Sequence, residues 1–300
     1  MGFDECKEKR WKMRAVGSLM PAEILSESCY LNIESPDALE KSQGDTHRAH
    51  LLPAASESPI LCVVKVAALN ASGPNRGIVN ELIGSHVAEV LKMPMPPRFG
   101  IIKITKRAAP DLPLWKRRPQ LKGECLAWWS QLVNEKSTKA RYNWDAFERF
   151  PDLRARILKD ILAELESAGI LADVIAFDDL VANVDRNIGN ILGSKDSGFV
   201  LIDHDQCLGG NAWTPQSLDG RSLYANKLMN ICLAMNQAAS LGSRALAYYD
   251  RAQAVLPATL TRLAVLVENE LAKPEIDAVN KFLLDRMELD HAASRFGLVA

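Results

Sequence analysis

The sequence predicts an α+β protein built from two parts, and three observations support this prediction. Short apolar runs bounded by turn residues, which are typical of strands, lie mainly before residue 107. After that position, apolar residues mostly recur at helical spacing. A Pro-rich, basic connector separates the two regions, as expected at a domain boundary. We therefore expect an N-terminal lobe over residues 1–107, with an antiparallel sheet and one helix. A mainly helical C-terminal lobe over residues 108–300 would carry a β-hairpin.

The N-terminal region combines strands with a single amphipathic helix. Residues 1–58 contain short apolar pieces among Ser- and Glu-rich tracts, which indicates short strands and long loops. Ile60–Ala67 is a run of apolar and β-branched residues before a turn cluster, so it predicts a buried strand that carries Lys65. Apolar residues at helical spacing from Ile78 to Leu91 predict a helix with Glu81 in its first turn.

The remaining elements follow from the same periodicities. A strand is expected over Gly100–Thr105, and helices over Leu153–Ala168 and Leu171–Val184. Between residues 190 and 203, two apolar runs flank the turn cluster Ser-Lys-Asp-Ser-Gly, which predicts a β-hairpin inserted among helices. The adjacent Trp128 and Trp129 are expected at helix positions, packed in the C-terminal lobe.

Composition and charge exclude several classes of protein. The 36 basic and 37 acidic residues give a net charge of −1, which provides no electrostatic footprint for nucleic acid. The six cysteines include no C-x-x-C pair, so neither a zinc knuckle nor a disulfide framework is expected. The charged N-terminus lacks the apolar core of a secretory signal, and no apolar stretch reaches the length of a membrane helix. We therefore expect a cytoplasmic protein that binds neither membranes nor nucleic acid directly.

Three polar side chains around the predicted hairpin form a pattern suited to phosphoryl transfer. Asp185 is followed five residues later by Asn190, and Asp203 ends the second strand of the hairpin. One carboxylate can take the proton of an attacking hydroxyl, while an amide oxygen and a second carboxylate hold Mg²⁺ against phosphates. A loop followed by a hairpin can place all three groups at one point. Asp185 and Asn190 alone would more simply cap turns.

The segment NVDRNIGNIL…FVLIDHD resembles the D-R-x-x-x-N and I-D motif pair of the HipA-like kinases, a branch of the protein-kinase-like fold. The resemblance extends upstream: the strand that carries Lys65 is similar to the family's phosphate-binding lysine strand, and Val79-Asn-Glu81-Leu to its N-E helix. An L-x-x-P-x-P turn follows from Leu91 to Pro96. Over about residues 44–210, the order and spacing of these pieces agree with that family.

The resemblance implies a bilobal kinase that uses ATP and Mg²⁺. Lys65 would pair with Glu81 and contact the phosphates, Asp185 would be the catalytic base, and Asn190 with Asp203 would hold the metal. The implied acceptor is a Ser/Thr hydroxyl on a protein, and family resemblance alone points to an antitoxin-type partner. A lysine in an apolar strand also has an ordinary explanation, because its stem can lie on apolar surface while its ammonium reaches water.

Two departures from the family keep other functions open. No G-x-G-x-x-G loop precedes the lysine strand, so the phosphate loop is placed at Gly44–His47, with Gly44 and Thr46 as its candidate cofactor-binding residues. The position two after Asp185, commonly histidine in relatives, is Asn187. A nucleotide-binding pseudokinase or scaffold is therefore an alternative, as is a small-molecule or lipid kinase.

Two neighbours of the motif residues have less specific assignments. Arg186 either touches phosphate or supports the loop through a carboxylate, with neither interpretation favoured. His204 is expected to hold the loop in place rather than to bind a ligand.

Overall fold

The computed structural model describes most of the chain, in the ranges 22–35, 45–54, 56–66, 75–235 and 238–298. The chain packs into two compact units. The sheet unit comprises Met1–Ala71 and Pro96–Leu132, and the helical unit comprises Ser72–Met95 and Val133–Ala300. None of the helices in the described ranges has the length and apolar content needed to cross a membrane.

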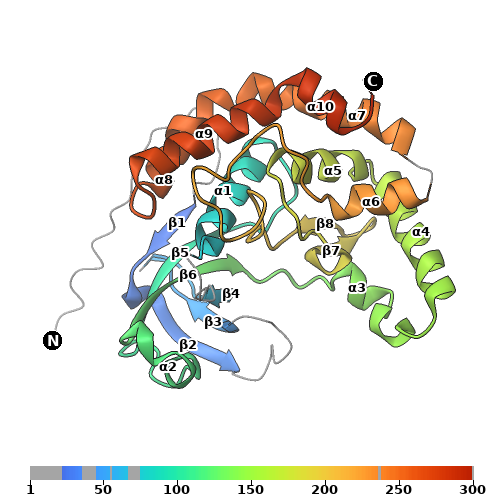
Figure 1. The fold of residues 1–300 in the computed structure, drawn as a ribbon. Coiled ribbons are helices and arrows are strands. Elements are labelled where there is room, and N and C mark those ends of the chain that lie inside the picture. The colour runs from blue at the N-terminus through green and yellow to red at the C-terminus, as the bar shows by residue number, and fades with distance from the viewer. Residues whose placement is uncertain (1–21, 36–44, 55, 67–74, 236–237, 299–300) are drawn as a thin grey trace. The chain divides into compact units, whose positions relative to one another are not determined.

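The sheet unit contains one mixed six-stranded sheet (Figure 1). Its strands are β1 (Glu23–Leu25), β2 (Tyr30–Ser35), β3 (Asp45–Leu51), β4 (Ile60–Val66), β5 (Phe99–Thr105) and β6 (Glu124–Gln131), in the spatial order β1-β5-β6-β4-β3-β2. The prediction of an antiparallel sheet was wrong at one edge, because β1 pairs with β5 in parallel, with Ile24 opposite Ile101. Parallel pairing needs a long connection, and the chain from β2 to α1 (Gly77–Val90) supplies it.

Strand alternation gives the sheet a buried face and a more accessible one. In β4 the side chains of Cys62, Val64 and Val66 are buried in the hydrophobic core, while Lys65 points to the other face. Trp129 of β6 is fully buried in the same core. Trp128 and Trp129 therefore pack as strand residues of the sheet unit, and the expected helix positions in the C-terminal lobe were wrong. Their bulky rings favour a pleated, half-buried surface as much as a helix.

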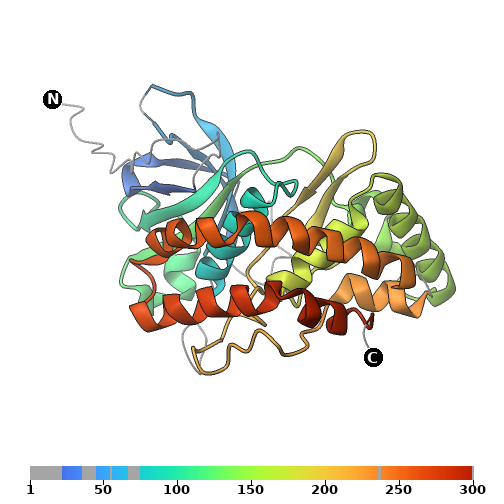
Figure 2. The same cartoon turned by 90° about the horizontal axis from the view of Figure 1, so that it is seen from above.

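The helical unit is made mostly of helices and one hairpin. Besides α1, its helices are α3 (Thr138–Arg141), α4 (Pro151–Ser167), α5 (Leu171–Leu180), α6 (Lys227–Ala234), α7 (Ala238–Val255), α8 (Leu260–Val267), α9 (Lys273–Met287) and α10 (Leu289–Arg295), and α2 (Leu114–Arg117) belongs to the sheet unit. Figure 2 shows α9 and α10 running beside α8 and α7, and this layer packs on α1 and α5. The hairpin consists of β7 (Ile191–Ser194) and β8 (Gly198–Leu201).

Local chemistry explains where the helices begin and end. The Asn75 side chain accepts a hydrogen bond from Gly77 N at 2.8 Å, which satisfies one of the free N–H groups at the start of α1. α4 begins at Pro151, whose missing N–H is not needed there. It ends at Ser167, and two residues later Gly169 has a φ of +75° and donates its N–H to Glu166 O. A left-handed residue at this position is most easily a glycine.

The predicted helix, lysine strand and hairpin are confirmed within a residue or two, but the chain divides differently from the predicted boundary at residue 107. β6 lies beyond that point and still belongs to the sheet unit, because it is hydrogen-bonded to β4 and β5. α1 lies before it and belongs to the helical unit, where it packs against α8. Strand pairing and helix packing determine which elements belong to each unit. The amino-acid composition indicated only the Pro-rich connector near residue 107.

We predict that the hairpin tolerates alanine at one glycine far better than at the other. Gly193 and Gly198 have φ values of +88° and +84°, so an alanine at either should cost about 1–2 kcal/mol of backbone strain. Only at Gly193 would the new Cβ also meet a backbone atom, Gly198 O, at 2.0 Å. Chemical denaturation of Gly193→Ala should therefore show a clearly larger loss of stability than Gly198→Ala. Equal losses would contradict the close approach of the two strands at Gly193.

Candidate functional site

Hydrogen bonds in the helical unit bring Asp185, Asn190 and Asp203 together around one turn. The Asn190 side-chain Nδ2 donates to Asp185 O at 3.2 Å. Ile202 N donates to Asn190 O at 3.1 Å, and Asp203 is the next residue of the chain. Asp185 and Asp203 are partly exposed, and Asn190 is buried. The turn and the end of the hairpin therefore hold these three polar residues close together, as the spacing predicts.

Arg186 is the buried charge around which this turn is built. Its side chain is fully buried, and its Nε donates to both carboxylate oxygens of Asp178 at 3.2 Å. Its Nη1 donates to the carbonyl oxygens of Ile202 and Asn190, and its Nη2 donates to His204 Nδ1 at 3.0 Å. A planar guanidinium presents donors in several directions at once, which a lysine does not. Of the two roles considered for Arg186, the structure places it in the supporting one.

The carboxylate that meets Arg186 comes from the second half of α5. Burial raises the pKa of Asp178 to about 6, while the charge of Arg186 and hydrogen bonds from Arg186 and Asn183 oppose this increase. Asn183 completes the arrangement, because its Nδ2 donates to Asp178 Oδ1 at 3.1 Å and its Oδ1 accepts Asp185 N at 3.1 Å. α5 thus fixes the backbone on both sides of Asp185.

Helix α1 holds the segment that follows Asp203. Glu81 is buried, and its Oε2 accepts a hydrogen bond from His204 N at 2.9 Å. Asn80, which is fully buried, donates through Nδ2 to the carbonyl oxygens of Asp205, Cys207 and Gly210 at 2.8–2.9 Å, and its Oδ1 accepts Trp213 Nε1 at 2.8 Å. The two neighbouring side chains therefore fix the backbone between residues 204 and 210 and hold the Trp213 side chain.

The contact between α1 and this segment is close. A Cβ added at Gly84 would come within 2.7 Å of His204 Cβ and 3.0 Å of Cys207 Sγ. His204 is buried and packs edge-on against the Phe177 ring, which agrees with its expected structural role. Burial raises the pKa of the Cys207 thiol well above its ordinary value, so this buried cysteine stays in the neutral form.

Asn190 and Asp203 provide donors that suit a hard cation. Because Asn190 Nδ2 is turned to Asp185 O, its amide oxygen Oδ1 is the atom left for a cation. Asp203 has a φ of +66°, in the left-handed region where a non-glycine residue is uncommon and often functional. In the described part of the chain, no cluster of three or more His, Cys, Asp and Glu residues could hold a metal. Mg²⁺ needs no such cluster, since it usually combines one or two carboxylates with waters and substrate phosphates.

The sequence pattern did not reveal two residues of this site. Asn80 received no role beside Glu81, although a polar residue in an otherwise apolar helix was a signal that could have been used. Lys227, the first residue of α6, forms an ion pair with Asp185 Oδ1. No motif connects residues 185 and 227, so this pair could be found only from the fold. Asn187 caps the turn, because its Oδ1 accepts a hydrogen bond from Gly189 N at 2.8 Å.

The predicted phosphate-binding residues belong to the sheet unit. Asp45–Leu51 is strand β3, so the placement of a phosphate loop at Gly44–His47 was wrong for Thr46 and His47, while Gly44 lies outside the described residues. The reason is that β3 pairs along its whole length with β4. Thr46 lies directly opposite Lys65 in that pairing, so their side chains share one face of the sheet.

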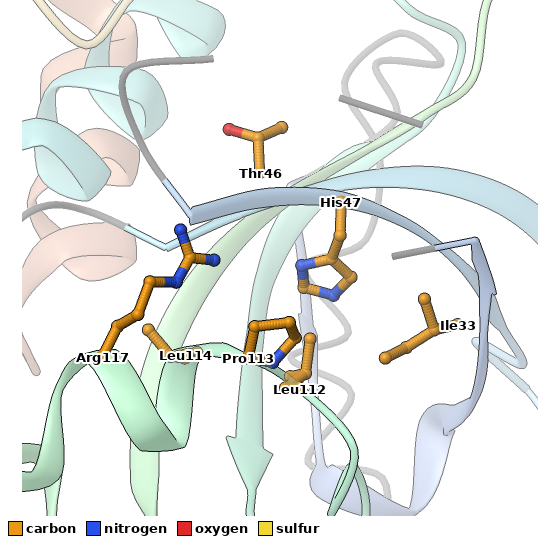
Figure 3. Close-up of a pocket in the computed structure, with 7 residues that line it drawn as sticks. All are labelled: Ile33, Thr46, His47, Leu112, Pro113, Leu114 and Arg117. Carbon is orange, nitrogen blue, oxygen red and sulfur yellow. The ribbon is translucent and has the colours of Figure 1, made fainter. Parts of the chain in front are cut away.

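The other face of β3 borders a pocket of the sheet unit. Its lining comes from Ile33, Thr46, His47, Leu112, Pro113, Leu114 and Arg117. Figure 3 shows His47 directed towards Leu112 and Pro113, whereas Thr46 points away from them. The His47 Nε2 lies 3.0 Å from the Tyr30 hydroxyl, and burial lowers the pKa of His47 to about 4. The pocket thus contains a neutral histidine, and Lys65 is not one of the residues that line it.

We predict that the Arg186–Asp178 pair is essential to the fold of the site. Because Arg186→Gln leaves a buried carboxylate without its partner, it should lower the free energy of unfolding by about 3–5 kcal/mol. Arg244 is a matched control, since its half-exposed ion pair with Glu166 lies at the surface. Arg244→Gln should cost less than about 1 kcal/mol. Urea denaturation measures both, and a small loss for Arg186→Gln would contradict the central position of the guanidinium.

Lys65 and Glu81 belong to different units, and their ion pair stays a prediction from the family resemblance. Comparison of the chain with models of known protein families and with curated proteins finds no match.

Proposed function

We propose that this protein transfers the γ-phosphoryl group of ATP, with Mg²⁺, to a Ser/Thr hydroxyl of a protein. The observation that carries the proposal is the meeting of Asp185, Asn190 and Asp203 around one buried arginine. Phosphoryl transfer needs a proton acceptor and a metal-holding pair in the same small region. A binding module that merely retained nucleotide would have no use for a carboxylate at Asp185. The choice of a protein acceptor follows the resemblance to the HipA-like kinases.

Each residue of the site has a distinct role in the proposed reaction. The hydroxyl oxygen of the acceptor forms a bond to the γ-phosphorus. At the same time, the Asp185 carboxylate accepts the proton of that hydroxyl. The bond between that phosphorus and the β,γ-bridging oxygen breaks, and its electron pair leaves with ADP. Asp185 then releases the proton to water. The products are ADP, the phosphorylated acceptor and one proton, so the charges balance.

The metal would be held by the oxygens of Asn190 and Asp203. Bound Mg²⁺ would neutralise part of the phosphate charge as it develops on the leaving oxygen. Glu81 stabilises this site, because its carboxylate accepts a hydrogen bond from the N–H of the residue after Asp203. This bond restricts the backbone at Asp203 and therefore the position of the Asp203 carboxylate. Lys65 is assigned to the nucleotide phosphates as part of the same proposal.

We predict that Mg-ATP stabilises the protein through Asp203. A ligand that binds only the folded state at about 100 times its dissociation constant adds roughly 2.7 kcal/mol. Thermal melting with millimolar ATP should therefore show a higher midpoint when Mg²⁺ is present than when it is chelated. Asp203→Ala should abolish the Mg²⁺-dependent part, whereas Asp196→Ala, in the exposed turn of the hairpin, should leave it intact. No shift for the unaltered protein would contradict both an active kinase and a pseudokinase.

We predict that Asp185→Asn separates transfer from binding. The change keeps the size of the side chain and removes the group that accepts the proton, so transfer should fall by a factor on the order of 10² or more. The affinity for Mg-ATP should stay nearly unchanged. Both are measured on one preparation, with labelled ATP and a cell lysate, so that label can appear on protein, lipid or small molecules. Undiminished transfer would show that Asp185 is not the base, and label on a lipid or small molecule would replace the protein acceptor.

A further inference from the structure

The ion pair between Asp185 and Lys227 is exposed, yet both of its residues lie in backbone segments that buried polar groups hold in place. The two side chains are 43% and 46% exposed, respectively, and an ion pair of this kind usually contributes little to stability. Nevertheless, the backbone next to each partner is fixed by buried polar groups. Such anchoring indicates that the position of the pair matters for something other than stability.

Both anchors lead to the same helix, α5. On one side, Asp178 holds Asn183, which in turn accepts the N–H of Asp185 at 3.1 Å. On the other side, the buried Asn226 donates through Nδ2 to Ile175 O at 2.8 Å. Residues 175 and 178 are three positions apart and therefore lie on one face of the helix. α5 thus places the proposed base and the start of α6 relative to one another.

Asn226 also fixes the helix that carries the lysine. It is the N-cap of α6, and its Oδ1 accepts Met229 N at 3.0 Å. Lys227 follows as the first residue of the helix. Positive charge in the first turn opposes the helix dipole, so a lysine at this position is unfavourable for α6 itself. The carboxylate of Asp185, in contrast, has the sign that this end of the helix favours.

We propose that Lys227 is a positioning residue for phosphoryl transfer, which holds Asp185 by Oδ1 so that Oδ2 receives the proton of the acceptor. This inference rests on the proposed function and adds a residue to its site. Removing the ammonium group frees the Asp185 side chain to rotate. Misplacement of a reacting group by about 1 Å can cost on the order of 10² in rate.

The test compares Lys227→Met, Lys227→Arg and a matched control, Lys273→Met. Lys273 also begins a helix, α9, and pairs with Asp277 at 2.6 Å, so it reproduces the loss of a first-turn lysine elsewhere. With labelled Mg-ATP, we measure phosphate released to water and label on the chain itself. Lys227→Met should lower kcat roughly 10- to 100-fold while the KM for ATP changes less than about 2-fold. Lys227→Arg, which keeps the charge, should restore most of kcat, and Lys273→Met should match the unaltered protein.

The outcomes distinguish the two proposals. If the unaltered protein transfers phosphate and Lys227→Met keeps its full kcat, the positioning role is overturned and the proposed function stands. If Lys227→Met and Lys227→Arg lose kcat equally and both melt at lower temperature than Lys273→Met, the lysine is structural and the inference is again overturned. If the unaltered protein neither binds nor hydrolyses Mg-ATP, the proposed function fails, and the inference fails with it.

Discussion

A guanidinium group removed from water must find acceptors for its donors, and in the helical unit this requirement organises the whole candidate site. Arg186 takes its acceptors from α5, from the turn before the hairpin and from the residues after it. Apart from α5, these segments are irregular and form few backbone hydrogen bonds of their own. Because the charge is fully buried, each lost acceptor would leave a costly unsatisfied donor. The positions of Asp185 and Asp203 are consequences of this arrangement.

Helix α1 stabilises an irregular segment that forms no regular secondary structure. The chain from residue 203 to residue 213 turns through several left-handed residues, including Asp203 and Leu208, and cannot pair as a strand. Asn80 and Glu81 supply the missing hydrogen-bond partners from one place on the helix. Gly84 lets the helix come close enough for them to reach. Asn80 and Glu81 together thus stabilise the conformation of this segment.

The sequence was most informative where the signal is local. Apolar periodicity predicted α1, β4 and the hairpin closely, because each buries one face over a few residues. The spacing of Asp185, Asn190 and Asp203 also predicted that these residues come together, since a turn and a hairpin link them. The sequence could not predict that β1 pairs in parallel with β5, or that Asn80 bonds to carbonyl groups about 125 residues away. These contacts depend on where distant segments arrive, and a strand such as β3 can be taken for a loop when its partner is unknown.

The course of the chain through the two units has a consequence for synthesis. The chain passes from one unit to the other three times, after Ala71, Met95 and Leu132. On the ribosome, β4 emerges long before its partner β6, and α1 emerges before both α8 and the segment that Asn80 clamps. Until β6 has been synthesised, the inner strand β4 therefore has one unpaired edge. Much of the apolar surface of α1 likewise stays exposed until α8 has been synthesised. A nascent chain of this design would depend on β6 to complete the sheet beside β4 and on α8 to cover α1.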